Sequence, residues 1–181
     1  MWISVSCTAL VVSLALLSAA PACAQDPEWS FNAKTPSPIQ IPGWLPADSL
    51  RNALAYHEAA DQIKGLAVDL NRDGAIDYIL QYSREVCGTN CQYELIDGRT
   101  RRSIGLVGGS VVYIRAQAIN GYPVINQYGH SSADSGSWST LVFDGQQFVS
   151  VGTVWLEGAA LEHLFGELKD VPYGEPRDNP R

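Results

Sequence analysis

The segment from residue 69 to residue 77 carries the side chains of this sequence that are best suited to bind a cation. Oxygen-bearing side chains recur at every second position and again at the end of the segment, at Asp69, Asn71, Asp73 and Asp77. A calcium ion takes about six to eight oxygen ligands, and a chain that curls around it presents alternate side chains inward. Gly74 supplies backbone freedom for a sharp turn, after which Ala75 can offer its main-chain carbonyl. The spacing predicts a structural calcium site at these five oxygen donors.

Apolar residues flank this segment and predict that it joins two strands. Val68 precedes it, and Tyr78 and Ile79 follow it. An EF-hand would instead have helices on both sides and an acid at the twelfth loop position, which is Leu80 here. We therefore exclude a helix–loop–helix site. Asn, Asp and Gly are also the common turn-forming residues, so a metal-free turn is the alternative interpretation.

The pattern D-x-N-x-D-G-x-x-D of residues 69–77 resembles the calcium loop of FG-GAP and VCBS-type repeats. The resemblance covers only about residues 66 to 82, and the Phe-Gly and Gly-Ala-Pro elements that name the family are missing. It implies calcium binding within a strand–loop–strand unit. It does not imply a propeller, because this chain is too short for several blades. Together with residues 87–91 and 136–138, the pattern also looks like small exported bacterial proteins of unknown function.

Residues 1–24 contain no charged side chain and indicate a secretory signal. Their apolar run ends in a small-x-small cleavage pattern at residues 22–24, so we expect a mature chain that begins at Gln25. An uncleaved anchor is the alternative. The mature chain keeps Cys87 and Cys91, which we expect to form a local disulfide, since neither a redox motif nor a zinc spacing is present. These features predict a periplasmic or secreted protein without a transmembrane segment after cleavage.

Residues 129–137 combine Ser, His and Asp, and we expect them to form a polar loop. A polar loop beside aromatic residues is typical of the rim of a binding surface. We assign four residues to this surface, Tyr128, His130, Asp134 and Trp138, for an unknown protein or envelope component. A hydrolase is the weaker alternative, because no Gly-x-Ser-x-Gly elbow follows a strand.

From about residue 65 to residue 156, segments rich in Val, Ile and Tyr alternate with turn signals and predict β-structure. The expected strands lie near residues 66–70, 76–82, 92–96, 103–107, 111–118, 123–128, 138–143 and 148–154. Helices are expected at 47–61, capped by Asp48 or Ser49, and at 159–168.

A weak internal repeat runs through the β region. Residues 79–83 resemble residues 125–129, and each segment is followed by a polar loop, a strand and an Asp-Gly turn, at Asp97 and Asp144. A repeated strand–loop–strand–turn–strand unit would explain this pattern, and coincidence among β segments is the alternative.

Four regions follow from these patterns. They are a signal peptide at 1–24, an extended Pro-rich segment at 25–46 that runs over the surface, a β-rich domain at 47–171 and a flexible tail at 172–181. We predict a mainly β fold, all-β to α+β: a single antiparallel β-sandwich or curled meander with one N-terminal helix and a short C-terminal helix.

Composition excludes several functions. A formal net charge of −7 argues against nucleic-acid binding, and Arg99, Arg101 and Arg102 form too small a basic cluster for it. We expect these arginines to protect an edge strand. No phosphate-binding or dinucleotide motif is present. We expect an exported, non-enzymatic binding or structural module with a calcium-binding loop. The alternative is a periplasmic inhibitor or immunity-type protein that binds an enzyme through residues 129–137.

Overall fold

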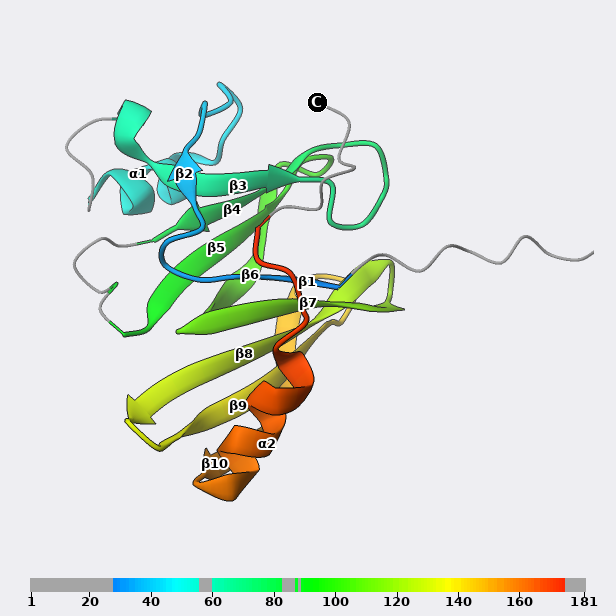
Figure 1. Cartoon of the computed structure of the whole chain (residues 1–181). Coiled ribbons are helices and arrows are strands. Elements are labelled where there is room, and N and C mark those ends of the chain that lie inside the picture. Colours follow the sequence, from blue (N-terminus) through cyan, green and yellow to red (C-terminus); the bar gives the residue numbers. More distant parts are fainter. Residues whose placement is uncertain (1–27, 56–59, 83–86, 88, 175–181) are drawn as a thin grey trace, which may run out of the picture.

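Two antiparallel sheets of five strands each form about half of the described part of the chain (Figure 1). The computed structural model describes residues 28–55, 60–82, 87 and 89–174. Sheet I has the order β2-β3-β4-β5-β6, with bounds Ser37–Pro38, Lys64–Val68, Asp77–Gln81, Cys91–Asp97 and Arg102–Gly109. Sheet II has the order β1-β7-β8-β9-β10, with bounds Trp29–Phe31, Val111–Ile119, Tyr122–Ser132, Ser135–Phe143 and Phe148–Glu157. The prediction of a mainly β fold is confirmed.

Each sheet contains one four-stranded meander in chain order, β3 to β6 in sheet I and β7 to β10 in sheet II. Each predicted strand segment overlaps one of these eight strands, but the predictions at 66–70 and 76–82 extend beyond the observed ends of β3 and β4. Asp97-Gly98 lies at the end of the third strand of the first meander, and Asp144-Gly145 follows the third strand of the second. The weak repeat in the sequence therefore matches the order of strands and turns in the two meanders.

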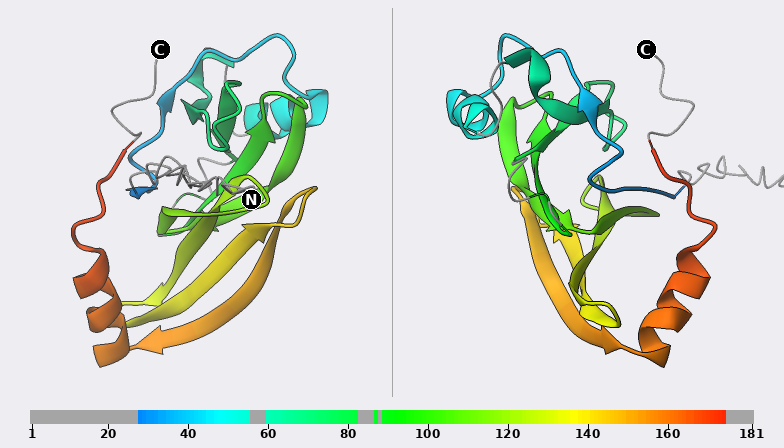
Figure 2. Two further views of the ribbon diagram at one scale, coloured as in Figure 1. Left: turned by 90° about the vertical axis from the view of Figure 1, so that its right-hand side faces the viewer. Right: turned by 60° about the vertical axis from the view of Figure 1, so that its left-hand side comes forward.

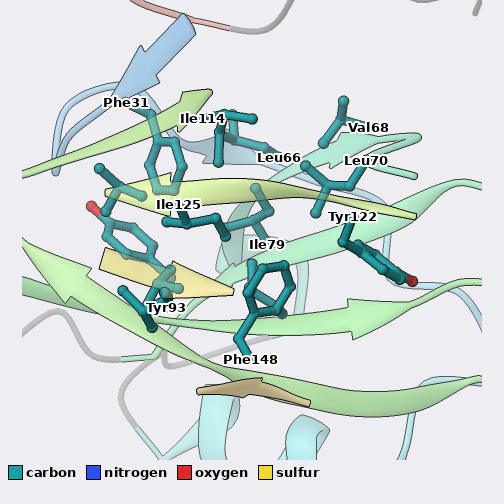
Figure 3. Close-up of a cluster of buried hydrophobic side chains, with 14 of the residues drawn as sticks. Phe31, Leu66, Val68, Leu70, Ile79, Tyr93, Ile114, Tyr122, Ile125 and Phe148 are labelled. Carbon is teal, nitrogen blue, oxygen red and sulfur yellow. The ribbon is translucent and has the colours of Figure 1, made fainter. Parts of the chain in front are cut away.

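The main hydrophobic core takes side chains from both sheets (Figure 3). Leu66, Ile79 and Tyr93 come from sheet I, while Ile114 and Ile125 come from sheet II. All five are 4% exposed or less. Burial of apolar surface at about 25 cal/mol per Å² makes this shared cluster the main force that holds the two sheets together.

The segment that we expected on the surface supplies a core strand instead. Phe31 and Ser30 in β1 are fully buried, and β1 pairs antiparallel with β7. The Ser30 main-chain N–H donates to the Pro172 carbonyl at 2.8 Å, and the Gly174 N–H donates to the Ser30 carbonyl at 2.9 Å. The first residues of the predicted flexible tail are thus bound to β1. The remainder of that tail and the predicted signal at 1–24 lie outside the described residues.

Two helices accompany the sheets. Helix α1 (Ala47–Leu54) is followed by a 3₁₀ turn, η1 (Ala60–Gln62), and covers a second apolar cluster that includes Leu80 and Ile96 of sheet I. The predicted caps are wrong: Pro46 is the N-cap, and the Ser49 hydroxyl donates to Glu94. Helix α2 (Ala159–Leu168) follows β10 and returns along sheet II (Figure 2). Among the described residues, no helix combines the length and apolar character that crossing a bilayer requires.

Candidate functional site

The predicted calcium segment connects two paired strands of sheet I. Strand β3 ends at Val68 and strand β4 begins at Asp77, and these two residues are register partners. The strands are shorter at the loop than the sequence indicated. Asp and Asn side chains bond to nearby main-chain N–H groups here, and such bonds compete with ladder pairing. Asp77 is therefore a strand residue at the base of the loop.

Three side chains fold into one turn. Asp69 accepts main-chain hydrogen bonds from Asp73 at 3.1 Å and from Gly74 at 2.9 Å. Asn71 Oδ1 accepts from the Asp73 N–H at 3.1 Å, and Asp73 Oδ1 accepts from the Ala75 N–H at 2.8 Å. Gly74 has a backbone φ of +84°, a conformation that residues other than glycine rarely adopt. The turn therefore gathers the oxygens of residues 69, 71 and 73 on its inner side.

Asp77 ties this loop to the turn between β5 and β6. Its carboxylate is fully buried and accepts hydrogen bonds from the Leu70 N–H at 2.9 Å and the Gly98 N–H at 2.8 Å. Burial raises the pKa of Asp77 to about 6, the two main-chain donors oppose this effect, and the negative charges of Asp97 and Asp69 add to it. The carboxylates of Asp97 and Asp69 therefore both lie close enough to repel Asp77.

Arg99 supplies positive charge to the loop. Its Nε donates to Asp73 Oδ2 at 2.6 Å, and its terminal nitrogen bonds to the Asp73 carbonyl. The bond to Arg99 is the main cause that lowers the pKa of Asp73. We expected the three arginines to protect an edge strand. Arg102 is the first residue of the edge strand β6, whereas the guanidinium carbon of Arg101 lies 5.8 Å from the centroid of the Trp44 ring. The sequence carried no signal for the Arg99 contact, because 26 positions separate it from Asp73.

The donor set of the loop has the chemistry that calcium prefers, since it offers carboxylate, amide and main-chain oxygens. Asp69, Asn71, Asp73 and Asp77 all lie in or at the base of the same turn, together with Ala75. Nevertheless, the described residues contain no ready cluster of three or more His, Cys, Asp or Glu side chains that could hold a metal. Main-chain N–H groups and Arg99 bond to the carboxylates of Asp69 and Asp73. Calcium would have to displace Arg99 from Asp73.

The chain matches no known family model, no curated protein and no solved structure. The resemblance to FG-GAP and VCBS-type loops therefore rests on the residues of this one segment.

Cys87 and Cys91 form a disulfide, with Cα atoms 4.3 Å apart. Asn90, inside the small ring that they close, reaches strand β8. Its Nδ2 donates to the His130 carbonyl at 2.9 Å, and its Oδ1 accepts from the His130 N–H at 2.8 Å. The ring thus anchors the end of the β8–β9 hairpin, a role for Asn90 that the sequence did not indicate.

Residues 129–137, expected to be a loop, form the end of that hairpin. Strand β8 continues to Ser132 and β9 begins at Ser135. Tyr128 is only 2% exposed and packs edge-on against Phe165 of α2, so it is wrongly assigned to a surface rim. Trp138 is partly buried beside Tyr113. Of the four assigned residues, Asp134 is exposed and His130 is half-buried.

The hairpin end does not assemble a catalytic triad in the described part of the chain. The Ser132 hydroxyl donates to Asp134 Oδ1 at 2.9 Å and lies 2.6 Å from the Ser135 hydroxyl. No described serine or aspartate bonds to the imidazole of His130, whose ring contacts Tyr128. A triad needs the base within hydrogen-bond reach of its nucleophile.

Proposed function

We propose that this protein is an exported, non-enzymatic binding or structural module whose 69–77 loop holds one structural calcium ion. The observation that carries the proposal is the convergence of Asp69, Asn71 and Asp73 in one turn above the buried Asp77. The repulsion that Asp69 exerts on Asp77 supports it, because a divalent cation would relieve that repulsion.

The proposed ligands are side-chain oxygens of Asp69, Asn71, Asp73 and Asp77 and the main-chain carbonyl of Ala75. A bound calcium ion would supply positive charge and would take part in no reaction. Arg99 bonds to Asp73 in this structure and would have to release it for Asp73 to act as a ligand. Since Asp77 also bonds to Leu70 and Gly98, the ion would stabilise the junction of β3, β4 and the β5–β6 turn.

Export and the sandwich arrangement are parts of the same proposal. The cleavage pattern at residues 22–24 supports a periplasmic or secreted location, and the Cys87–Cys91 bond is consistent with an oxidising compartment. The core shared by sheets I and II supports a β-sandwich.

A calcium titration of the melting temperature tests the proposed site. Because only the folded loop presents these oxygens together, the free energy of unfolding should rise by about 2.7 kcal/mol at 100 times the dissociation constant. Magnesium should do less, since it demands octahedral geometry and gives up water reluctantly. Asp69→Asn should abolish the shift, while Asp144→Asn, at an exposed turn, should retain it.

Arg99→Gln sharpens the test. This change removes the competing charge at Asp73, so we expect calcium to bind more tightly to this variant than to the wild type. A chelator-treated wild type that melts at the same temperature with and without millimolar calcium would show that the loop is a metal-free turn.

A second candidate function is inhibition of an enzyme through the end of the β8–β9 hairpin. The hydrogen bonds that fix this hairpin support it, from Asn90 to His130 and from the Gly158 N–H to the Asp134 carbonyl at 3.0 Å. A rigid binding element loses less entropy on association. Affinity capture from envelope extract should recover one enzyme with the wild type and lose it with His130→Ala and Asp134→Ala together; capture that is unchanged by both substitutions rejects this candidate.

A further inference from the structure

Strand β10 forms a long free edge of sheet II. Among the described residues its only strand partner is β9, and Figure 2 shows it along the outer margin of the sheet. Its first residue, Phe148, packs against Gly105 of β6, but every residue from Ser150 to Trp155 is exposed. Val151, Val154 and Trp155 are 60%, 54% and 58% exposed. A long apolar edge of this kind is a template for pairing with another strand.

The other sheet edges in the described part of the chain are short, covered, or partly charged and bonded to the other sheet. Strand β2 has two residues and includes Pro38. Strand β1 is flanked by the C-terminal segment through the bonds of Ser30 with Pro172 and Gly174. Strand β6 begins with Arg102, and its Gly108 N–H donates to Gln127 of β8 at 2.8 Å. Proteins normally protect edges by such devices, and β10 has only a bulge near Val151.

Charge favours a second copy of this chain as the partner of β10. The protein carries a net charge of −7, so two copies repel each other overall. Between Asp144 and Glu157, however, no residue is charged, so two β10 strands can approach without like-charge contact. An antiparallel pair of identical strands is also self-complementary under a twofold axis, as a symmetric dimer requires.

We propose that the protein forms a twofold dimer in which β10 pairs antiparallel with β10 of a second copy, with the axis at Val154. In this register Thr153 lies opposite Trp155 of the partner subunit, and Gly152 leaves room for the partner subunit's Leu156. The register lies wholly within the regular part of the strand, beyond the irregularity between Ser150 and Gly152. Sheet II then continues across the dimer, and both free edges disappear.

The two faces of β10 determine what the dimer covers. Val154 is the register partner of Trp138, whereas Trp155 is the partner of Ser137. Since successive side chains point to opposite faces, Val154 and Trp155 lie on different faces of sheet II. Pairing along the edge contacts both side chains at once, which a partner seated on one face alone would not do. An aromatic residue beside a β-branched one is a favourable cross-strand pair.

Sedimentation of the exported wild-type protein over a range of concentrations tests this proposal. We expect a concentration-dependent dimer. Val154→Lys places two like charges at the axis and should raise the dimer dissociation constant at least about tenfold, while the unfolding midpoint of the monomer stays unchanged. Leu106→Lys is the matched control, because Leu106 is 51% exposed on the edge strand of sheet I, and this variant should dimerise like the wild type.

Crosslinking tests the register. Residues that face each other on the axis have Cα atoms about 4.5–5.5 Å apart, within the range of a disulfide. Val154→Cys should form a covalent dimer under mild oxidation, and Leu106→Cys should not. A wild type that is monomeric at all soluble concentrations would overturn the proposal. A Val154→Lys variant that dimerises as tightly as the wild type would also overturn it. So would a Val154→Lys monomer whose unfolding midpoint falls, because that result would indicate that another part of the same chain covers β10.

Discussion

Asp97 shows how hydrogen bonds keep a carboxylate ionised inside this protein. It is 6% exposed and accepts hydrogen bonds from the Thr100 N–H and from the Tyr122 hydroxyl. Burial acts to raise the pKa of Asp97, but these bonds outweigh it and hold the pKa below its ordinary value. In return, burial and the bond to Asp97 raise the pKa of Tyr122. The hydrogen bond between the Tyr122 hydroxyl and the Asp97 carboxylate therefore stabilises the fold only while Asp97 is ionised.

We predict that Tyr122→Phe lowers the free energy of unfolding by about 1.5–3 kcal/mol at pH 7, the typical value of a hydrogen bond to a charged group. Because the folded-state pKa of Asp97 is depressed, this contribution is present above the unfolded value and is lost as the pH falls through the folded value. The difference between wild type and variant should therefore shrink below about pH 4. Urea unfolding at several pH values measures it.

Tyr93→Phe is the matched control for this prediction. The Tyr93 hydroxyl is buried and has no hydrogen-bond partner among the described residues. Removing an unpartnered polar group should be neutral or stabilising. If Tyr122→Phe were as harmless as Tyr93→Phe at pH 7, the bond to Asp97 would contribute nothing to stability.

The two Asp-Gly turns occupy equivalent places in the two meanders but need glycine for different reasons. A Cβ atom at Gly98 would lie 1.9 Å from the Ile76 carbonyl oxygen, so the turn packs against the end of the 69–77 loop. Gly145 has open space around it, and only its φ of +106° favours glycine. One turn is therefore limited by packing and the other by backbone conformation.

We predict that Gly98→Ala destabilises the protein more than Gly145→Ala does. The Gly145 variant should lose about 1–2 kcal/mol, the cost of a left-handed conformation for an ordinary residue. Gly98 has no left-handed backbone, but the Gly98 variant must move the β5–β6 turn away from Ile76, which should weaken the hydrogen bond to Asp77 and any calcium response. Thermal unfolding of both variants, with calcium and with chelator, makes the comparison; equal losses would contradict the packing argument.

Across the whole molecule, the N-terminal strand joins parts of the chain that are distant in sequence. Phe31 of β1 is fully buried and packs edge-on against Tyr93 of sheet I, with ring centroids 5.0 Å apart. The same strand pairs with β7 of sheet II and with the segment after α2. Strand β1 therefore links both sheets to the C-terminal segment of the described chain.

We predict that Phe31→Ala lowers the free energy of unfolding by about 3–5 kcal/mol, the usual cost of removing a buried aromatic ring. Leu106→Ala, at an exposed edge position, should change it by about 0.5 kcal/mol or less. Chemical denaturation of both variants measures the difference. A small effect of Phe31→Ala would mean that the N-terminal segment lies on the surface, as its proline content first indicated.

The strands were predictable because their signal is local. Runs of Val, Ile and Tyr between turn residues marked all eight strands of the meanders, and the Asp-Gly pairs marked two of the turns. Strand β1 was missed because three residues between prolines carry no periodic pattern. The proposed calcium residues were found together for the same reason, since they lie within nine consecutive positions.

The sequence by itself determined the mainly β class, the Cys87–Cys91 pairing and the set of oxygen donors in the 69–77 loop, because each depends on residues close together in the chain. Only the tertiary structure decided that Arg99 neutralises Asp73, that Asn90 anchors β8 and that Tyr128 is buried. These contacts join residues far apart in sequence, and their partners are selected by sheet register and packing. The free edge of β10 belongs to the same class, because whether a strand lies at an edge depends on the order of strands in the sheet and on no residue within the strand.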